Sequence, residues 1–301
     1  VNQATGRCSV KGSKFWFNCN PDGPYHWFKQ NWIDKSTGYL GKEETARRIQ
    51  QAAAEGKDPG LKDILYLHFT MDDNLSLDEE IKARYRSMYV GVFFKRYIMG
   101  LWAAAEGIIY DMFDENKHVQ DLKDFYQLLI NGNRYVSCDY GTQNATVFLL
   151  WNKGTNGKWY CIREYYYSGR NKGKQKTDSE YADDLKVWLD GTKIKAIIVD
   201  PSAASFIAEL RKRGYKVLKA NNDVLDGIRL VGMLLNLEKI VFASSCKETI
   251  KEFASYIWDE KALERGEDKP VKQWDHCLDS TRYMCSTIIG RKAARFREIR
   301  R

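Results

Sequence analysis

The chain has 301 residues, of which 44% are hydrophobic and 29% are charged, a balance typical of a globular protein and not of a disordered or fibrous one. It contains no apolar run of about 18 residues, and its first residues lack the basic and apolar segments of a signal peptide, so we expect an intracellular protein without membrane insertion. The seven cysteines are odd in number and include no C-x-x-C pair, which argues against a disulfide framework and against a zinc ribbon.

The net charge of +8 belongs to the second half of the chain. Residues 1–133 carry 17 Lys and Arg against 18 Asp and Glu, whereas residues 134–301 carry 31 against 22. The last eleven residues, RKAARFREIRR, form a basic tail. This distribution favours a polyanionic partner such as a nucleic acid, although charge alone is equally compatible with a basic surface that serves solubility.

The first half predicts short elements separated by loops. SKFWFNC predicts a strand, and the following NPDGP predicts a sharp turn. TARRIQQAAA predicts a helix that ends in a Gly/Pro turn, and DILYLHFT predicts a second strand. Ser76 and Glu79 have the spacing of a capping box, which predicts the start of another helix. Residues 101–117 have no regular pattern.

The second half predicts a mixed sheet. RYVSCDYG, ATVFLLW and WYCIREYYY are three consecutive strands separated by turns, which is typical of an antiparallel meander. Helical and strand patterns then alternate from DSEYADDLKVWLDG to DVLDGIRLVGMLLN, and IKAIIVD is apolar enough to be buried on both faces. Two last helices are expected around 246–258 and 274–290. We therefore expect an α/β domain whose mixed sheet is flanked by helices.

Three acidic residues lie where predicted elements end or face the sheet. Asp139 and Asp200 each close an apolar strand, and Asp279 lies in the last helix three residues after His276. Because the carboxyl ends of parallel strands lie side by side, these groups can converge on one point. Clustered carboxylates select Mg²⁺ or Mn²⁺, and the imidazole favours Mn²⁺. For each acid alone, a turn or cap is the simpler interpretation, and we favour a helix cap for Asp275.

Four ordered motifs resemble one known family. YVSCDYGTQNAT, AIIVDPSAASFIAELRKRG, ANNDVLDGIRLV and QWDHCLDSTRYM resemble the nuclease motifs of the tailed-phage terminase large subunit, of the PBSX-like type. The resemblance implies a ribonuclease H-like nuclease that holds two ions, Mg²⁺ or Mn²⁺. It also implies that Asp139, Asp200 and Asp279 are the catalytic, metal-binding carboxylates, that Asp139 contacts both ions, and that His276 is the additional metal ligand found in some members.

The first half resembles the same family. FWFNCNPDGPYHWFKQNW resembles the segment that ends the packaging ATPase, and RYRSMYVGVFFKRYIMGLWAAAEGIIYDMF resembles the stretch that leads into the nuclease. No G-x-x-x-x-G-K-[ST] phosphate loop is present. The expectation is a chain that lacks the N-terminal part of the motor and cannot hydrolyse ATP as it stands. Asn18 and Asn20 are candidates for the ATPase coupling segment, and a plain turn at Asn20 is an equally good interpretation.

The expected domains are a C-terminal remnant of the packaging ATPase (1–70), a linker subdomain (71–130) and a ribonuclease H-like nuclease with a basic C-terminal tail (131–301). The loop residues Arg170, Lys172, Lys174 and Lys176 are candidates for contacts to DNA phosphates, and a solvated loop is equally compatible with them.

The resemblance implies a metal-dependent endonuclease that cleaves double-stranded viral DNA and belongs, at full length, to an ATP-driven packaging motor. The implied partners are double-stranded DNA, the portal protein and the terminase small subunit, without a membrane. The implied location is the host cytoplasm, with transient docking on the procapsid. Two alternatives stay open: a catalytically idle module that docks on the portal and grips DNA, and a ribonuclease H-like resolvase or transposase.

Overall fold

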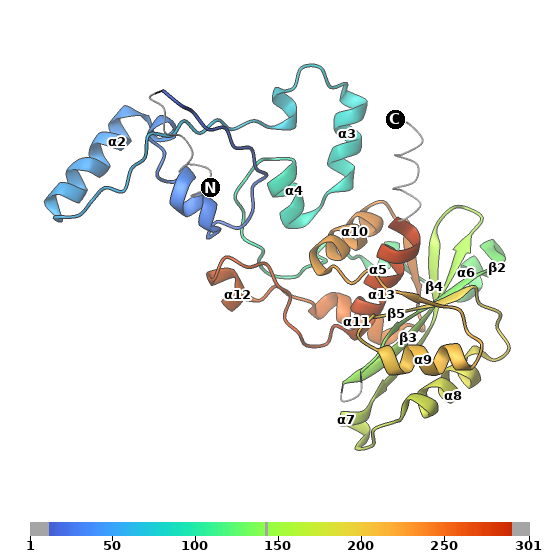
Figure 1. Cartoon of the computed structure of the whole chain (residues 1–301). Helices are drawn as coiled ribbons and strands as arrows, with labels where there is room; N and C mark the ends of the chain where they lie inside the picture. The colour runs from blue at the N-terminus through green and yellow to red at the C-terminus, as the bar shows by residue number, and fades with distance from the viewer. Residues whose placement is uncertain (1–11, 142–143, 291–301) are drawn as a thin grey trace.

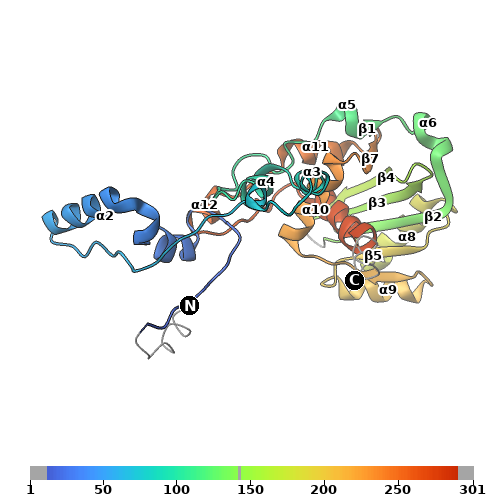
Figure 2. The same ribbon diagram turned by 90° about the horizontal axis from the view of Figure 1, so that it is seen from above.

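The computed structural model describes residues 12–141 and 144–290 of the chain. An α/β body built around one sheet holds the green to red part of the chain, and the N-terminal part extends away from it (Figures 1 and 2). Among the described residues, no helix combines the length and the apolarity needed to cross a bilayer.

The described residues form a seven-stranded mixed sheet in the order β1-β7-β4-β3-β2-β5-β6. Strands β2, β3 and β4 form an antiparallel meander, while β5 pairs in parallel with β2 and β6, and β7 in parallel with β4 and β1. The strands are β1 (Val119–Gln120), β2 (Leu129–Asp139), β3 (Ala145–Gly154), β4 (Trp159–Ser168), β5 (Ala196–Val199), β6 (Val217–Lys219) and β7 (Ile240–Ala243). The expected meander and mixed α/β sheet are confirmed.

Helices cover both faces of the sheet. Buried residues of α8 and α9 pack on one face, and those of α10, α11 and α13 pack on the other (Figure 2). The helices are α2 (Thr37–Ala54), α3 (Glu79–Met88), α4 (Gly91–Tyr97), α5 (Glu115–His118), α6 (Leu122–Phe125), α7 (Gly169–Lys172), α8 (Asp178–Leu189), α9 (Ala204–Lys212), α10 (Val224–Asn236), α11 (Lys247–Ser255), α12 (Glu260–Glu264) and α13 (His276–Met284). A π-helical turn, Cys285–Ile289, continues α13.

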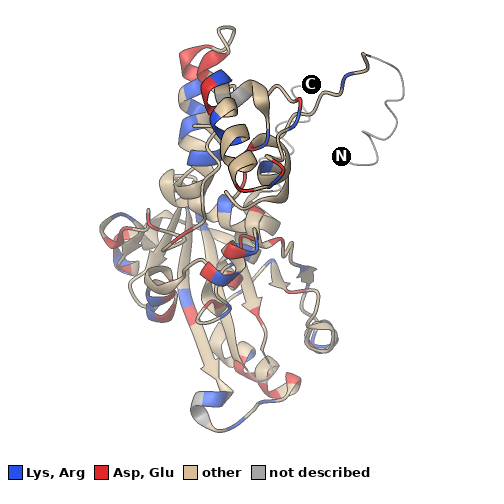
Figure 3. Cartoon of the chain, turned by 90° about the vertical axis from the view of Figure 1, so that its left-hand side faces the viewer, with Lys and Arg blue, Asp and Glu red and all other residues tan. Residues whose placement is uncertain are grey.

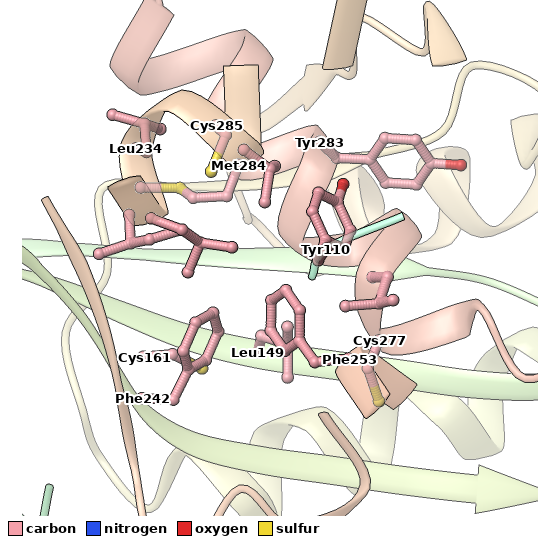
Figure 4. Packing of buried hydrophobic residues seen from close by; sticks show 14 of the residues in the cluster. Tyr110, Leu149, Cys161, Leu234, Phe242, Phe253, Cys277, Tyr283, Met284 and Cys285 are labelled. Atoms are coloured by element: carbon pink, nitrogen blue, oxygen red, sulfur yellow. The ribbon is translucent and has the colours of Figure 1, made fainter. Parts of the chain in front are cut away.

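Strand β3 is buried along both faces. Because successive side chains of a strand point to opposite faces, β3 contributes to the core on both sides of the sheet. Leu149 and Trp151 face the α10, α11 and α13 side, and Phe148 and Leu150 face the α8 and α9 side. Figure 4 shows the first side, where Phe242 of β7 and Phe253 of α11 pack edge to face with ring centroids 5.1 Å apart. Each such side chain, when buried, contributes about 1.5–3 kcal/mol of transfer free energy.

Strands β1 and β7 were not predicted. Strand β7 has only four residues, all buried, and lies between two helices, so its apolar run is too short for its period to be read. Its pairing with β4 and with the two residues of β1 places it in the sheet.

The two strands expected in the first half are wrong. SKFWFNC and DILYLHFT carry the right residue types, but in the described part of the chain neither forms a ladder, and the nearest pairing is an isolated bridge between Ser36 and Lys62. Phe69, for example, is 71% exposed. A strand needs a hydrogen-bonded neighbour, so propensity alone does not produce one.

The capping box expected at Ser76 and Glu79 is also wrong. Helix α3 begins at Glu79 with Asp78 at the N-cap position, and the side chain of Ser76 bonds to Asn74 instead. A capping box does occur earlier, where Thr70 and Asp73 bond reciprocally around a short 3₁₀ turn.

Arg96 of α4 connects three separate stretches of the chain. Its guanidinium is 3% exposed, pairs with Asp268 and with Asp22 at 3.0 Å, and donates to the carbonyl of Ala103. A buried arginine is stable only when its donors are satisfied in this way. The contact joins the turn after the first aromatic run to α4 and to the loop that follows α12.

Helix α10 has a glycine where the side chain of Arg282 crosses it. A Cβ atom at Gly227 would lie 2.3 Å from Cγ and 2.5 Å from Cδ of Arg282, so only glycine leaves room for that buried side chain. Arg282 donates to the carbonyls of Asn222 and Asp223 just before α10, so this crossing ties α10 to α13.

We predict that Gly227→Ala lowers the free energy of unfolding by about 1–3 kcal/mol, because the added methyl group overpacks the contact with Arg282. Helix propensity alone favours alanine by about 1 kcal/mol, so a loss of stability isolates the clash. Urea denaturation measures the effect. Val187→Ala on α8, at a side chain 78% exposed, is the control. Equal stability of the two variants would contradict the prediction.

Candidate active site

The site begins at the centre of the sheet, where β2 and β5 end together. Cys138 of β2 pairs with Val199 of β5, so the next residues, Asp139 and Asp200, leave neighbouring parallel strands at the same edge. This is the juxtaposition expected from the sequence. It follows from the parallel register, which brings together residues that are 61 positions apart along the chain.

Helix α13 crosses β2 and β3 and contributes the next group. The hydroxyl of Ser280 lies 2.8 Å from that of Ser137, which also accepts the indole N–H of Trp151 at 2.9 Å, so a buried polar contact fixes the helix against the sheet. His276, the first residue of α13, then places its Nδ1 atom 2.9 Å from Oδ2 of Asp139. His276 and Asp139 therefore meet, as predicted from the sequence.

Tyr283 links Asp139 to Asp200. Its hydroxyl lies 3.5 Å from Oδ1 of Asp139 and also contributes to lowering the pKa of Asp200. Asp200 accepts hydrogen bonds from the backbone N–H of Ser202 at 2.7 Å and from the amide of Asn222 at 3.3 Å. Burial raises the pKa of Asp200, but these donors outweigh it, so the pKa lies below its usual value and the carboxylate is charged.

Asp279 faces two cations. Its Oδ1 accepts from the guanidinium of Arg282 at 2.6 Å, and its Oδ2 lies 3.3 Å from the ammonium of Lys272. Arg282 is 2% exposed, so this ion pair is buried. One carboxylate of the predicted set is therefore neutralised by the chain itself.

Asp275 occupies the N-cap position of α13, as we expected from the sequence, but its side chain makes no capping hydrogen bond. Its Oδ2 atom is buried without a hydrogen bond and lies 3.4 Å from the ammonium of Lys272. Burial lowers the pKa of Lys272, but Asp279 and Asp275 outweigh it and raise that pKa, so the lysine is a charged bridge between two carboxylates.

The surroundings of Asp139 disfavour the charged form of its carboxyl group. Burial raises its pKa to about 6, the charge of Asp279 adds to the rise, and the hydrogen bond from His276 opposes it. For His276, burial lowers the pKa, but the contact with Asp139 outweighs this and raises it. Asp139 and His276, both partly buried, therefore stabilise each other's charge, while the carboxylate of Asp279 repels that of Asp139.

The donors fit a hard divalent cation. Carboxylate oxygens with one imidazole suit Mg²⁺ or Mn²⁺, and both the raised pKa of Asp139 and the unbonded Oδ2 of Asp275 mark places where positive charge is favourable. In the described residues, no group of three or more His, Cys, Asp or Glu side chains is already arranged as a metal cage. Ion binding would require His276 and Lys272 to leave their present partners. The assignment of these residues as metal ligands stays a prediction.

Four contributors to the site were missed from the sequence: Tyr283, Arg282, Lys272 and Asn222. Tyr283 lies four residues after Asp279 and Arg282 three, spacings that place them near that acid on one helix and could have revealed them. Lys272 lies before the helix, and Asn222 lies in the loop before α10. Only tertiary structure brings these two to the carboxylates.

The other candidate residues lie in the segment that follows β4, which leaves the sheet at the same edge as Asp139. Lys176 pairs with Asp184 and lies 4.3 Å from the ring centroid of Tyr167, whereas Lys174 lies 3.6 Å from Glu180 and is largely exposed. Arg170 is exposed, and the side chain of Lys172 lies outside the described part of the chain. Basic and acidic residues are interspersed along the ribbon (Figure 3). Contacts of this loop with DNA stay a prediction.

Asn18 and Asn20 are exposed and lie in a segment without regular structure. Their expected coupling role stays a prediction. The basic tail from residue 291 onward lies outside the described residues.

We predict that Asp139→Asn stabilises the protein at pH 8 by about 1–3 kcal/mol, because the folded state holds this carboxyl proton more tightly than the unfolded chain does. The native carboxylate becomes a cost as the pH rises from about 4 to about 6. The advantage of the variant should therefore vanish near pH 4 and be complete above pH 7. Urea unfolding between pH 4 and pH 8 measures this, and an advantage that is independent of pH would contradict it.

Comparison with known proteins indicates the family of this chain. It is 54% identical to the large terminase of a thermophilic bacteriophage solved in complex with ADP, with a TM-score of 0.79 over 96% of this chain and 65% of that one. The structure of the same large terminase with ATP-gamma-S gives the same identity and TM-score over 66% of its chain. The curated terminase large subunit of Escherichia phage T5 is 26% identical over 241 residues, which are 76% of this chain and 53% of that protein.

No protein-family model matches the chain. The chain spans just under two thirds of the thermophilic phage protein and about half of the T5 protein. Three observations point to the same family: the order of the four motifs, the mixed sheet, and the 54% identity over 96% of the chain. The chain belongs to the terminase large subunit family.

Proposed function

We propose that this chain carries the nuclease of a DNA-packaging terminase and cleaves double-stranded viral DNA by metal-dependent hydrolysis of phosphodiester bonds. The observation that carries the proposal is the meeting of Asp139, His276 and Asp200 at one edge of the sheet, through direct contact and through Tyr283. Functional sites of α/β sheets usually lie at the carboxyl ends of parallel strands, and the carboxylates gather there.

In this proposal Asp139, Asp200 and Asp279 are the catalytic carboxylates, and His276 completes the ligand set. Bound Mg²⁺ or Mn²⁺ would activate the attacking water and neutralise the leaving oxygen. The protein's own contribution is orientation: Arg282 fixes one oxygen of Asp279, and the hydroxyl of Tyr283 contacts Asp139 and helps to keep Asp200 charged. Asp200 stays charged because its donors lower its pKa, so it can bind a cation without first losing a proton.

The finer assignments belong to the same proposal. The sheet is that of a ribonuclease H-like nuclease covering 131–301, preceded by a linker subdomain at 71–130 and by the end of a packaging ATPase domain at 1–70. We assign ATP hydrolysis, and coupling through Asn18 and Asn20, to the full-length protein. Double-stranded DNA, the portal protein and the small subunit are the proposed partners, with Arg170, Lys172 and Lys174 on DNA phosphates. Lys176 would first have to leave Asp184.

We predict that the chain nicks and linearises supercoiled plasmid with Mn²⁺, and that Asp139→Asn, Asp200→Asn and Asp279→Asn each slow cleavage by about 100-fold or more, because each loses several kcal/mol of charge stabilisation. Gel electrophoresis of the plasmid measures the rate. Asp183→Asn on α8, at a side chain 65% exposed, should cut like the wild type. An Asp200 variant that cuts as fast as the wild type would contradict the assignment.

A wild-type chain that binds no Mn²⁺ but binds portal protein tightly would support the idle docking module. Branched DNA cut much faster than linear duplex would favour a resolvase.

We also predict that Lys272→Gln tightens Mn²⁺ binding about threefold to tenfold, because it removes a positive charge 3.3 Å from Asp279 and 3.4 Å from Asp275. Isothermal titration with MnCl₂ measures the dissociation constant. Lys269→Gln is a matched control three residues earlier, where the lysine is 61% exposed and pairs with Glu267. Weaker binding by the Lys272 variant would contradict the role of Lys272 as a resident counter-ion.

A further inference from the structure

Two glutamates, the partly buried Glu164 and the buried Glu252, connect the sheet to the first turn of α13. The first is Glu164, in the middle of β4. Its carboxylate accepts the backbone N–H of Glu248 at 3.0 Å and that of Thr249 at 2.7 Å, as well as the hydroxyl of Thr249 at 2.6 Å. Glu248 and Thr249 are in the first turn of α11, whose N–H groups have no partner within the helix. Glu164 therefore caps α11 from another element.

The second glutamate, Glu252, repeats the arrangement one turn further along α11. It is 4% exposed, and its Oε2 atom accepts the backbone N–H of Cys277 at 2.7 Å and that of Leu278 at 3.1 Å. These N–H groups belong to the first turn of α13, whose own N-cap residue, Asp275, makes no capping bond. Helices α11 and α13 lie side by side (Figure 1), so Glu252 is the cap of α13.

Neither glutamate has a cationic partner in residues 12–141 and 144–290, where no lysine, arginine or histidine forms an ion pair with either of them. Their side-chain oxygens face the N–H groups at the N-terminal ends of two helices instead. Burial raises the pKa of Glu252 to about 8, against the opposing effect of the N–H groups of Leu278 and Cys277 and of the nearby His276. Such a costly buried group calls for an explanation.

The explanation is geometric. Cys277 directly follows His276, and Asp279 directly follows Leu278, so the two N–H groups held by Glu252 lie between these two residues of the candidate active site. Fixing those N–H groups fixes the rotation of the first turn and hence the direction in which His276 and Asp279 project. Functional groups need their geometry held within about 0.5 Å and 10–20°.

We propose that Glu252 is a positioning residue of this active site, and that Glu164 acts one step behind it by holding α11. The inference rests on the proposed function in one respect, namely that His276 and Asp279 take part in metal-dependent cleavage. The sequence DHCLD at 275–279 presents metal-binding types, but it does not say what orients them. Glu252 lies 24 residues before His276 in the sequence, and Glu164 lies 112 residues before it.

The test compares Glu252→Met with Glu252→Gln in the full chain of 301 residues. Methionine has a similar size but no oxygen, whereas the amide oxygen of glutamine can accept both N–H groups because both already bond to a single atom, Oε2. We expect Glu252→Met to weaken Mn²⁺ binding by about 10- to 100-fold and glutamine to restore it to within about threefold. Titration calorimetry with MnCl₂ measures both.

A second readout is independent of metal and of cleavage. Hydrogen exchange at the amides of Cys277 and Leu278 should be faster in Glu252→Met and close to wild type in Glu252→Gln, because only methionine leaves these N–H groups without a partner. Glu248→Ala, on the same helix and with its side chain paired to Lys251, is the matched control and should change neither amide exchange nor Mn²⁺ affinity. Glu164→Gln should affect α13 less than Glu252→Met does.

The outcomes separate this inference from the proposed function. If the wild type binds no Mn²⁺ and cuts no DNA, the proposed function fails, while amide exchange still tests the cap. If the wild type binds Mn²⁺ and Glu252→Met binds it equally well with unchanged exchange at residues 277 and 278, the positioning role is overturned. Should Glu252→Met not fold, a Glu252→Gln variant with weakened Mn²⁺ binding despite native amide exchange would also overturn it.

Discussion

The candidate site depends on one electrostatic constraint: four acidic side chains gather at one edge of the sheet, where Asp275 and Asp279 are buried and Asp139 and Asp200 are partly buried. Carboxylates in such a place repel one another, and the protein offsets the repulsion with its own positive groups. Arg282 and Lys272 face Asp279, His276 faces Asp139, and hydrogen-bond donors surround Asp200. The offset is incomplete at Asp139, whose pKa is raised to about 6. Burial is the larger cause of that rise and the charge of Asp279 a smaller one, and a divalent cation bound here would offset both.

The same constraint explains the architecture around α13. The helix has to be held firmly enough to keep charged groups together, and it is anchored in three ways: by apolar packing of Leu278 and Met284, by the contact between Ser280 and Ser137, and by the cap from Glu252. Gly227 leaves space for Arg282 to pass α10. Stability and site geometry are therefore coupled, so a packing change at a distance can move the carboxylates.

The N-terminal part follows different rules. Its aromatic and aliphatic residues are exposed at many positions, among them Trp16 at 81% and Leu65 at 64%, and its extended segments have no ladder within the described residues. What holds it to the α/β body includes the buried guanidinium of Arg96 between Asp22 and Asp268. In the proposed function, this ion-paired junction lies between the end of the motor and the nuclease.

The sequence by itself determined the meander, the helices that follow it and the identity of the acids, because periods of 2 and 3.6 residues and strand ends are local properties. It predicted that Asp139 and Asp200 lie side by side, because parallel strands end at one edge of a sheet, and that a helix brings His276 and Asp279 toward them; the strand ends and the contact of His276 with Asp139 are observed. It failed for SKFWFNC and DILYLHFT, since a strand depends on a partner that no local pattern supplies. Tertiary structure alone decided the counter-ions. Lys272, Asn222, Glu252 and Glu164 reach the acids or α13 only through contacts between distant segments, and charge balance in a buried site is a property of those contacts.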